Sequence, residues 1–258
     1  MSHFKEEAVV VKQEMLQEGI YSLYIETKDI AKNSVPGQFV SVYTSDGSKL
    51  LPRPISICEA DGNILRLVYR VVGFGTKEFS GYKEGDKVSV MGPLGNGFPL
   101  KEKDAILVAG GIGIPPMVQL AKKLREDYAD IKITSVIGYR DKNTFLVEEI
   151  EKYSEVVIAT DDGSLGVHGN VIDAIKEKDI QGEVIYSCGP TPMLRGLKAY
   201  AEEKQIETWI SLEEKMACGI GACLACVCKT KEVDHHSHVH NTRICKDGPV
   251  FNSREVEI

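Results

Sequence analysis

Four cysteines near the carboxyl terminus have the spacing of a metal-cluster ligand set. Three follow the pattern C-x4-C-x2-C and the fourth lies downstream; they are Cys218, Cys223, Cys226 and Cys245. This spacing is typical of a plant-type [2Fe–2S] site, where four thiolates surround a small two-iron body. The alternative is a structural zinc site, which usually uses two C-x2-C pairs, and only Cys223/Cys226 fits that pattern. The spacing therefore favours iron–sulfur over zinc.

The residues around these thiols raise three further points. Gly219 and Gly221 suit a backbone that curls tightly over the cluster, because glycine tolerates left-handed dihedral angles. Cys228 lies two residues beyond a ligand and could exchange with it, but we interpret it as a packed, unligated side chain. The segment His235–His240 holds four histidines that could bind a transition metal or, as we prefer, form a solvated loop tip.

Two motifs in the first half of the chain could hold a nucleotide. In Arg53-Pro54-Ile55-Ser56 the arginine can grip a phosphate, the proline fixes the backbone and the serine can hydrogen-bond a ring nitrogen. In Gly73-Phe74-Gly75-Thr76 the backbone amides could cradle a pyrophosphate. Taken singly, these are also an ordinary strand start and a hairpin turn. Together, ahead of a nucleotide-binding sheet, they indicate a flavin nucleotide.

A third motif indicates a dinucleotide. Gly110-Gly111-Ile112-Gly113 follows a continuous apolar run and precedes an amphipathic helix predicted over 117–125, which is the context a dinucleotide loop requires. A tight turn that binds nothing is the alternative. Cys188 ends a later strand, at the edge of the sheet where a nicotinamide would lie. Its alternative role is that of a small buried residue.

The elements that must position these motifs fall into three groups. Residues 4–101 contain short runs of β-branched and aromatic residues separated by turn residues, which predicts an antiparallel barrel or sandwich. After Lys103, strands alternate with helices predicted over 117–125, 144–153, 170–178 and 193–204, which predicts a doubly wound parallel sheet. The tail has too few apolar residues for a core of its own. We expect an α+β multidomain protein with domains 1–101, 102–211 and 212–258.

Composition limits the classes of partner. A formal net charge of −7 argues against nucleic acid or an anionic membrane as the main partner. No apolar run approaches the ~20 residues of a membrane span, and the polar N-terminus has no signal-peptide core. An odd number of cysteines, seven, suits a reducing compartment and a metal role. We therefore expect a cytoplasmic protein.

In their order along the chain, Arg-Pro-x-Ser, Gly-x-Gly-Thr, Gly-Gly-x-Gly-x-Pro-Pro and Cys-Gly-Pro-x-Pro-Met resemble the motifs of the ferredoxin-reductase superfamily. The segment from Ser211 to Cys223 and the ending Cys245-Lys246-Asp247-Gly248-Pro249-Val250-Phe251 narrow the resemblance. They are similar to the electron-transfer subunits of type B, NAD-dependent dihydroorotate dehydrogenases. The similarity covers essentially the whole chain.

This resemblance implies a role for each motif. FAD would be bound by Arg53, Pro54, Ile55 and Ser56, by Val68, Tyr69 and Arg70 along the flavin and ribityl chain, and by Gly75 and Thr76 at the pyrophosphate. NAD would be bound at Gly110, Gly111 and Gly113. The cysteines Cys218, Cys223, Cys226 and Cys245 would ligate the [2Fe–2S] cluster. Ser56, near the flavin N5, and Cys188 are the candidate catalytic residues.

The resemblance also implies a function. A partner subunit with FMN would oxidise dihydroorotate, and this chain would pass the electrons through [2Fe–2S] and FAD to NAD in pyrimidine (UMP) biosynthesis, within a heterotetramer of two subunits of each kind. NAD rather than NADP fits the acids of 161–162 and the mixed charges of 140–142. One alternative is a reductase subunit of a hydrogenase, sulfite reductase or ferredoxin:NADP system. Another is a redox sensor or a zinc-stabilised binding module.

Overall fold

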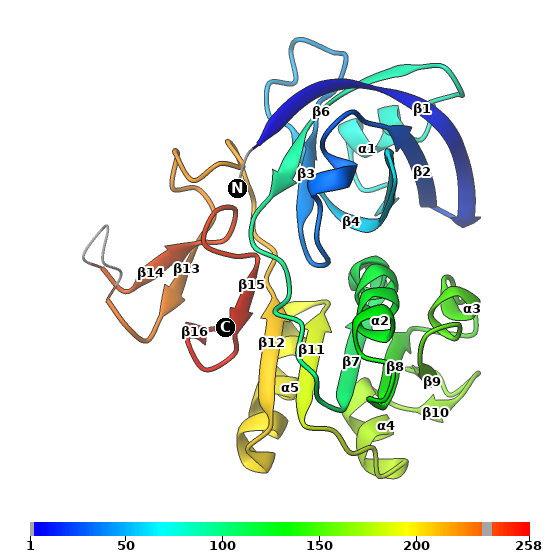
Figure 1. The fold of residues 1–258 in the computed structure, drawn as a ribbon, viewed down its shortest axis with the longest axis vertical. Coiled ribbons are helices and arrows are strands. Elements are labelled where there is room, and N and C mark those ends of the chain that lie inside the picture. Colours follow the sequence, from blue (N-terminus) through cyan, green and yellow to red (C-terminus); the bar gives the residue numbers. More distant parts are fainter. Residues whose placement is uncertain (1–2, 234–238) are drawn as a thin grey trace.

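The computed structural model describes residues 3–233 and 239–258. Figure 1 shows a barrel above a sheet covered by helices, with the carboxyl-terminal segment beside both. The barrel strands are β1 (Phe4–Gln17), β2 (Ile20–Glu26), β3 (Phe39–Val42), β4 (Arg53–Asp61), β5 (Ile64–Arg70) and β6 (Lys87–Leu94). They close in the order β1-β2-β5-β4-β3-β6, and every pairing between them is antiparallel. Of the two predicted architectures, the barrel is confirmed.

Two short helical segments accompany the barrel. The 3₁₀ turn η1 (Ala31–Asn33) precedes β3, and α1 (Phe74–Phe79) follows β5. Phe79 from α1 enters the barrel core, where it meets the ring of Tyr69 edge to face. The Gly-Phe-Gly-Thr motif is thus the start of a helix rather than the hairpin turn considered as its alternative.

The second unit is a sheet with helices on both faces. Its strands are β7 (Ala105–Gly110), β8 (Ile133–Tyr139), β9 (Glu155–Thr160), β10 (Val167–His168), β11 (Val184–Cys188), β12 (Glu207–Ser211) and β15 (Val250–Asn252). The helical segments are η2 (Gly111–Gly113), α2 (Pro115–Asp127), α3 (Val147–Ile150), α4 (Val171–Glu177) and α5 (Thr191–Lys204). The order β10-β9-β8-β7-β11-β12 is parallel throughout. The predicted doubly wound parallel sheet is confirmed.

The seventh strand of this sheet comes from the tail. β15 pairs antiparallel with β12 and joins the edge of the sheet, although the sequence analysis assigned residues 212–258 to a separate domain. The other tail strands, β13 (Val227–Thr230), β14 (Asn241–Arg243) and β16 (Val256–Glu257), form a small sheet of their own. We call residues 213–233 and 239–258 the cluster segment. Its one edge strand anchors it to the nucleotide-binding sheet.

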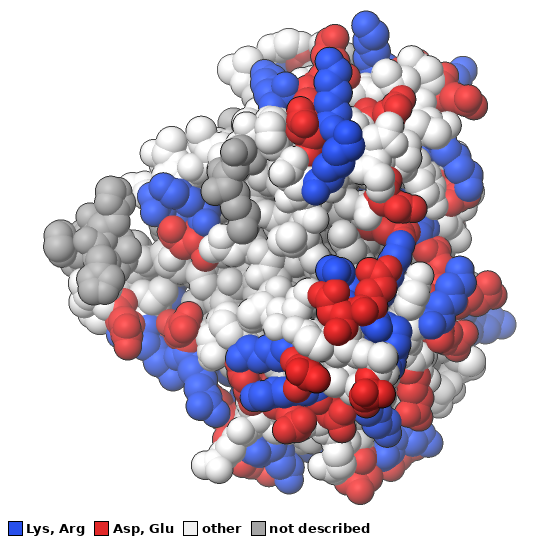
Figure 2. Space-filling view, viewed as in Figure 1, with Lys and Arg blue, Asp and Glu red and all other residues white. Residues whose placement is uncertain are grey.

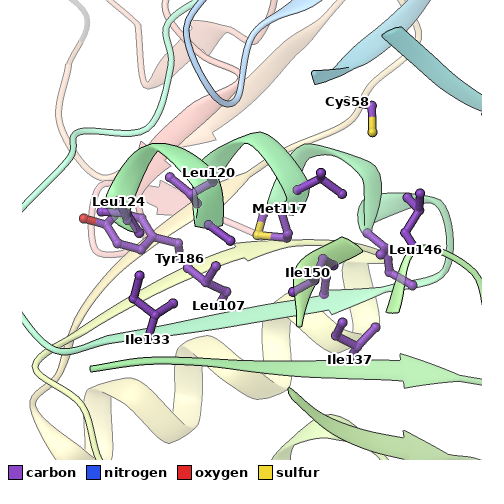
Figure 3. Packing of buried hydrophobic residues seen from close by; sticks show 14 of the residues in the cluster. Cys58, Leu107, Met117, Leu120, Leu124, Ile133, Ile137, Leu146, Ile150 and Tyr186 are labelled. Carbon is purple, nitrogen blue, oxygen red and sulfur yellow. The ribbon is translucent and has the colours of Figure 1, made fainter. Parts of the chain in front are cut away.

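Apolar burial joins the barrel to the sheet. In Figure 3, α2 lies over the sheet with Met117, Leu120 and Leu124 directed toward Leu107, while Cys58 of barrel strand β4 lies on the other side of the helix. Cys58 is fully buried and belongs to the same cluster as these residues. Because one continuous core spans β4, α2 and β7, the two units are held in a defined relation.

The surface carries charges of both signs. On the face shown in Figure 2, Lys and Arg side chains are interspersed with Asp and Glu rather than gathered into a field of one sign. None of the helices among the described residues has the length and apolar character that crossing a membrane requires.

Candidate functional site

The two nucleotide motifs of the barrel meet each other. Arg53 begins β4, and its side chain lies so close to Gly75 that a Cβ atom there would be 2.7 Å from Arg53 Nε and 3.0 Å from Cγ. The preceding loop also reaches α1, since Lys49 Nζ lies 5.2 Å from the Phe74 ring centroid. Residues more than twenty positions apart in the sequence therefore form one surface that includes the Arg53 guanidinium.

The two segments that meet at Arg53 and Gly75 carry exposed apolar side chains. Leu50 is 82% exposed, Val72 is 81% exposed, and Leu51 and Phe74 are more than half exposed. Large apolar groups near a cation provide a surface that the ring and phosphate of a nucleotide would cover together. The donor set and the missing Cβ of Gly75 fit a flavin nucleotide.

The Thr76 side chain caps the start of α1. Its Oγ1 accepts hydrogen bonds from the amides of Val72, at 2.9 Å, and Gly73, at 3.2 Å. This is a capping arrangement that fixes the first turn of α1. The side chain is buried, so Thr76 holds the shape of the Gly73–Gly75 backbone rather than presenting its hydroxyl to solvent.

The predicted flavin-lining residues of β5 alternate between two environments. Val68 packs in the core shared with α2, whereas Tyr69 packs inside the barrel and donates a hydrogen bond of 3.0 Å to Gln13 Oε1. Successive strand residues point to opposite faces, so this difference is a consequence of the pleat. The exposed Arg70 points toward the nucleotide-binding unit, where a Cβ on Gly111 would lie 3.7 Å from its Nη2.

The glycine loop after β7 interlocks with the turn after β11. A Cβ on Gly113 would collide with the carbonyl oxygen of Cys188 and lie 2.6 Å from the amide nitrogen of Gly189. A Cβ on Gly110 would lie 2.9 Å from Met193 Sδ of α5. Both turns leave the carboxyl edge of neighbouring parallel strands, where ligands bind in open α/β sheets. Gly113 is therefore required for this close approach, whatever else the loop binds.

Cys188 lies where the sequence predicted, at the last position of β11. It pairs in register with Ser211 of β12, and the Ser211 hydroxyl is a hydrogen-bond partner of its thiol. Burial raises the pKa of the Cys188 thiol to about 12, with Ser211 opposing this in part. The thiol is consequently neutral at physiological pH. A cavity of about 580 Å³ opens beside it and is lined by Gly189, Glu213 and Cys228, among others.

The segments considered for selecting NAD over NADP lie side by side. The amide of Asp161 donates to the carbonyl of Tyr139 at 3.1 Å, and that of Asp162 donates to the carbonyl of Arg140 at 3.2 Å. The carboxylate of Asp162 accepts from the hydroxyl and amide of Ser164, which lowers its pKa. Asp162 thus holds its own turn together beside Asp161 at the end of β9.

The four predicted ligand cysteines lie in one part of the cluster segment as two pairs. The thiol of Cys218 is a hydrogen-bond partner of Cys223, and the thiol of Cys245 is a partner of Cys226. Among residues 3–233 and 239–258, no three His, Cys, Asp or Glu side chains form a group that could hold a metal ion. A two-iron body takes two thiolates on each iron, so two neighbouring pairs fit it. A single tetrahedral zinc would need all four at one point.

Backbone amides point at these sulfurs. Gly221 donates to Cys245 Sγ at 3.1 Å, Ala222 to Cys218 Sγ at 3.3 Å, and Cys245 to Cys226 Sγ at 3.4 Å. Burial raises the pKa of Cys218, but the surrounding amides outweigh it and lower the pKa to about 6. Gly219 and Gly221 have φ of +71° and +82°, as their predicted place in a tight curl requires. The amides therefore favour the thiolate of Cys218, the form that binds iron, whereas burial and the neighbouring Cys226 raise the pKa of Cys245 to about 12.

Cys228 and His240 are the described residues that remain from the cysteines and histidines singled out in the tail. Cys228 is half-buried on β13, borders the 580 Å³ cavity and packs against the apolar core that includes Cys226 and Cys245. The predictions for His235, His236 and His238 lie outside the described residues. His240 Nδ1 is 3.1 Å from the carbonyl oxygen of Lys231, a contact that closes the loop locally.

The cluster curl lies against the barrel strand next to the flavin motif. A Cβ on Gly219 would be 2.9 Å from Ser41 Oγ, and Ser41 pairs in register with Pro54. On the same strand, Phe39 pairs with Ser56. One strand thus separates the cysteine curl from Arg53-Pro54-Ile55-Ser56, which suits electron transfer between groups held at the two places.

Sequence reasoning missed Ser41 and Ser211, although each contacts a predicted site. Both are buried serines in apolar strands and resemble ordinary core positions in the sequence. Only strand register, which sets Ser41 opposite Pro54 and Ser211 opposite Cys188, indicates their importance.

Comparison with known proteins agrees with this geometry. Residues 213–257 match the family described as the iron–sulfur cluster binding domain of dihydroorotate dehydrogenase B, and residues 107–199 match the oxidoreductase NAD-binding domain. Among solved structures, that of an NADH-dependent reduced ferredoxin-NADP oxidoreductase is similar, with a TM-score of 0.86 and 31% identity over 97% of this chain and 89% of that chain. A ferredoxin NADP+ reductase from Neisseria gonorrhoeae, with bound FAD and NADP, shares the fold at 13% identity over 77% of this chain and 91% of that one, with a TM-score of 0.64.

Curated relatives are closer in sequence. The chain is 42% identical over 260 residues to the electron transfer subunit of dihydroorotate dehydrogenase B (NAD+) from Geobacillus sp. (strain WCH70), with 98% of each chain covered. It is 43% identical over 259 residues to the protein of the same name from Listeria innocua serovar 6a, again with 98% of each covered. The chain therefore belongs to the family of electron transfer subunits of NAD+-dependent dihydroorotate dehydrogenase B.

Proposed function

We propose that this chain carries electrons from a dihydroorotate-oxidising partner subunit to NAD+, as an oxidoreductase subunit of pyrimidine biosynthesis. Its cofactors are FAD, a [2Fe–2S] cluster and NAD. An iron–sulfur cluster passes single electrons, NAD accepts two as hydride, and a flavin does both, so FAD belongs between the other two. The observation that carries the proposal is the contact of the cysteine curl, through Gly219 and Ser41, with the strand beside Arg53–Ser56.

The residues of the barrel would bind and orient FAD. Arg53 would pair with its phosphates across Gly75, and Thr76 would keep the Gly73–Gly75 backbone in place for them. Ser56 would hydrogen-bond the flavin ring near N5. Val68 and Arg70 would face the flavin side of β5, with Tyr69 contributing its backbone because its side chain fills the barrel.

The nucleotide-binding sheet would hold NAD at its carboxyl edge. The loop Gly110–Gly113 leads into the 13-residue helix α2, and because Pro115 and Pro116 have no amide hydrogen, amides of the glycine loop itself would face the diphosphate. Cys188 would lie beside the nicotinamide as a neutral thiol, excluding water rather than acting as a nucleophile. Asp161 would meet a ribose hydroxyl, which favours NAD over NADP.

The cysteine pairs Cys218/Cys223 and Cys226/Cys245 would each ligate one iron of the cluster. The amides of Gly221, Ala222 and Cys245 would stabilise the negative charge on the sulfurs. Cys228 would remain unligated.

The partner implied by the family is a catalytic subunit, for which we propose FMN as cofactor and a heterotetramer of two subunits of each kind. Seven cysteines without a disulfide among them suit a reducing compartment, and we propose the cytoplasm. Co-expression with a dihydroorotate-oxidising subunit of the same genome would test the proposed complex with a catalytic subunit. We expect a stable complex that reduces NAD+ with dihydroorotate, and neither subunit alone should do so. Dihydroorotate oxidation by this chain alone would refute the division of labour.

A second candidate follows from the 31% identical ferredoxin-NADP oxidoreductase structure. In this second candidate function, the chain would be the reductase subunit of a complex that uses ferredoxin and NADP instead of dihydroorotate. Relatives 42% and 43% identical favour the first proposal. The same complex, assayed with NADH and NADPH and with dihydroorotate and reduced ferredoxin, separates the two.

A further inference from the structure

A charged cluster lies between the barrel and the nucleotide-binding sheet and belongs to none of the cofactor motifs. Its members are Glu59 on β4, Arg66 on β5, Lys122 on α2 and Glu149 on α3. We call these four residues the interdomain charge cluster. The barrel supplies one acid and one base, and the nucleotide-binding unit supplies the complementary pair.

Arg66 is the centre of the cluster. Its side chain is 5% exposed, its Nε donates to Ser22 Oγ at 2.9 Å, and its Cζ lies 5.1 Å from the Tyr24 ring centroid. A buried guanidinium is costly unless its charge and its donors are paired. Ser22 and Tyr24 therefore fix the orientation of the guanidinium, so that its two terminal nitrogens, Nη1 and Nη2, point out of the barrel.

The Arg66 guanidinium pairs with a carboxylate of the nucleotide-binding unit, across the interface with the barrel. Arg66 Nη2 donates to Glu149 Oε1 at 3.0 Å, and Nη1 donates to the other carboxylate oxygen. Burial alone would lower the pKa of Arg66, but the hydrogen bonds to Glu149 outweigh it and the pKa lies above its ordinary value. This bidentate pair fixes direction as well as distance.

A second contact crosses the same interface. Lys122 Nζ donates to Glu59 Oε1 at 2.9 Å, and Arg66 Nη1 lies 3.9 Å from Glu59 Oε2. The charges thus alternate from Lys122 through Glu59 and Arg66 to Glu149. Two of the three contacts join the barrel to the nucleotide-binding unit, so a rotation of one unit against the other would break both.

Each member lies close in sequence to a cofactor motif. Glu59 follows Ser56 on β4, and Arg66 precedes Val68 on β5. Lys122 lies on the helix that starts after Gly110–Gly113, and Glu149 lies beyond the loop that follows β8. The cluster therefore connects the strands of the predicted flavin site to the elements that carry the predicted NAD site.

We propose that the Arg66–Glu149 pair is a positioning contact that sets the distance and angle between the flavin and the nicotinamide. The proposal rests on the proposed function, in which hydride passes between these two rings. The pair itself exchanges no proton or electron. Its effect comes through geometry, since a displacement of ~1 Å at reacting atoms costs on the order of 100-fold in rate.

The test uses the cofactor-loaded complex with its partner subunit. Glu149→Gln keeps the shape of the side chain and removes its charge. We expect flavin reduction by NADH in stopped flow to slow by about tenfold or more, with a larger isotope effect from 4-deuterated NADH and unchanged FAD content. Glu148→Gln, an exposed acid on the same short helix, is the matched control and should behave as wild type.

Arg66→Lys provides a second variant, because lysine keeps the charge but not the planar fork. It should slow flavin reduction less than Glu149→Gln does. Hydrogen exchange of the chain without cofactors gives a readout independent of activity. Amides of α3 and of residues 140–146 should exchange faster in Glu149→Gln than in Glu148→Gln.

The outcomes separate this inference from the proposed function. If exchange rises in Glu149→Gln while the rate and isotope effect of flavin reduction match wild type, the pair only stabilises the fold and the inference is overturned. If NADH fails to reduce the flavin of the wild-type complex, the proposed function falls and this inference falls with it. If Glu149→Gln does not fold, an unchanged rate in Arg66→Lys overturns the inference.

Discussion

Arg53 crosses directly over Gly75, with its Nε 2.7 Å from the position that a Cβ of residue 75 would occupy. Gly75→Ala would therefore displace the arginine side chain, which can swing away into solvent without disturbing the barrel. We expect the variant to fold but to bind FAD about tenfold more weakly, equivalent to ~1.4 kcal/mol. The ratio of flavin to protein absorbance in purified material measures this loss.

Gly73→Ala is the matched control for this substitution. A Cβ at residue 73 would meet nothing within 4 Å, and its extended backbone is open to any residue. The control should retain FAD. Equal flavin content in the two variants would show that Arg53 does not need the space above Gly75.

The thiols of the cluster segment give a second prediction. Cys245→Ser removes a buried member of the Cys226/Cys245 pair, whereas Cys228→Ser alters a thiol that borders the 580 Å³ cavity. We expect loss of most of the iron in Cys245→Ser and full iron content in Cys228→Ser. Iron analysis and the paramagnetic signal after reduction check this. Loss of iron in Cys228→Ser instead would reassign the fourth ligand.

Ser56 gives a third prediction. It is half-buried on β4, in register with Phe39, close to the place where the cysteine curl contacts the barrel. Ser56→Ala should retain FAD but slow flavin reduction by NADH by roughly 10- to 100-fold, the range expected for a lost hydrogen bond to a reacting group. Ser56→Thr keeps the hydroxyl and should recover much of the rate. Unchanged NADH oxidation by Ser56→Ala would refute the role.

Local pattern predicted the parts of the molecule that depend on neighbours in sequence. Gly219 and Gly221 adopt the left-handed backbone that their place between ligand cysteines required. The helices predicted over 117–125 and 170–178 correspond to α2, which begins with two prolines, and to α4, which Asn170 caps. In each case the determining contact lies within a few residues, so the sequence carries it.

Contacts between distant segments could not be predicted in this way. Arg66 pairs with Glu149 across 83 positions, and β15 joins a sheet whose other strands lie before residue 212. Nothing in the sequence of 250–252 indicates which edge it covers. The sequence likewise did not indicate that the ring of Tyr69, which is predicted to line the flavin, packs inside the barrel. Such outcomes depend on register and tertiary packing, which periodicity alone does not specify.

Glu207 gives a prediction about acid stability. It accepts from Lys101, from Lys103 Nζ at 3.2 Å and from Trp209 Nε1 at 2.9 Å, joining the linker after the barrel to β12. Burial raises its pKa, but these partners outweigh it and lower the pKa to about 2. Because the folded pKa lies below the unfolded value, the stabilisation is complete above about pH 4.5 and is lost toward pH 2.

Glu207→Gln should therefore cost about 1–2 kcal/mol at pH 7, and the difference in the free energy of unfolding from wild type should shrink as pH falls through this window. Urea unfolding of both chains from pH 7 to pH 2.5 measures it, with the exposed Glu203→Gln as a control of little effect. A difference that stays constant down to pH 2.5 would contradict the assignment.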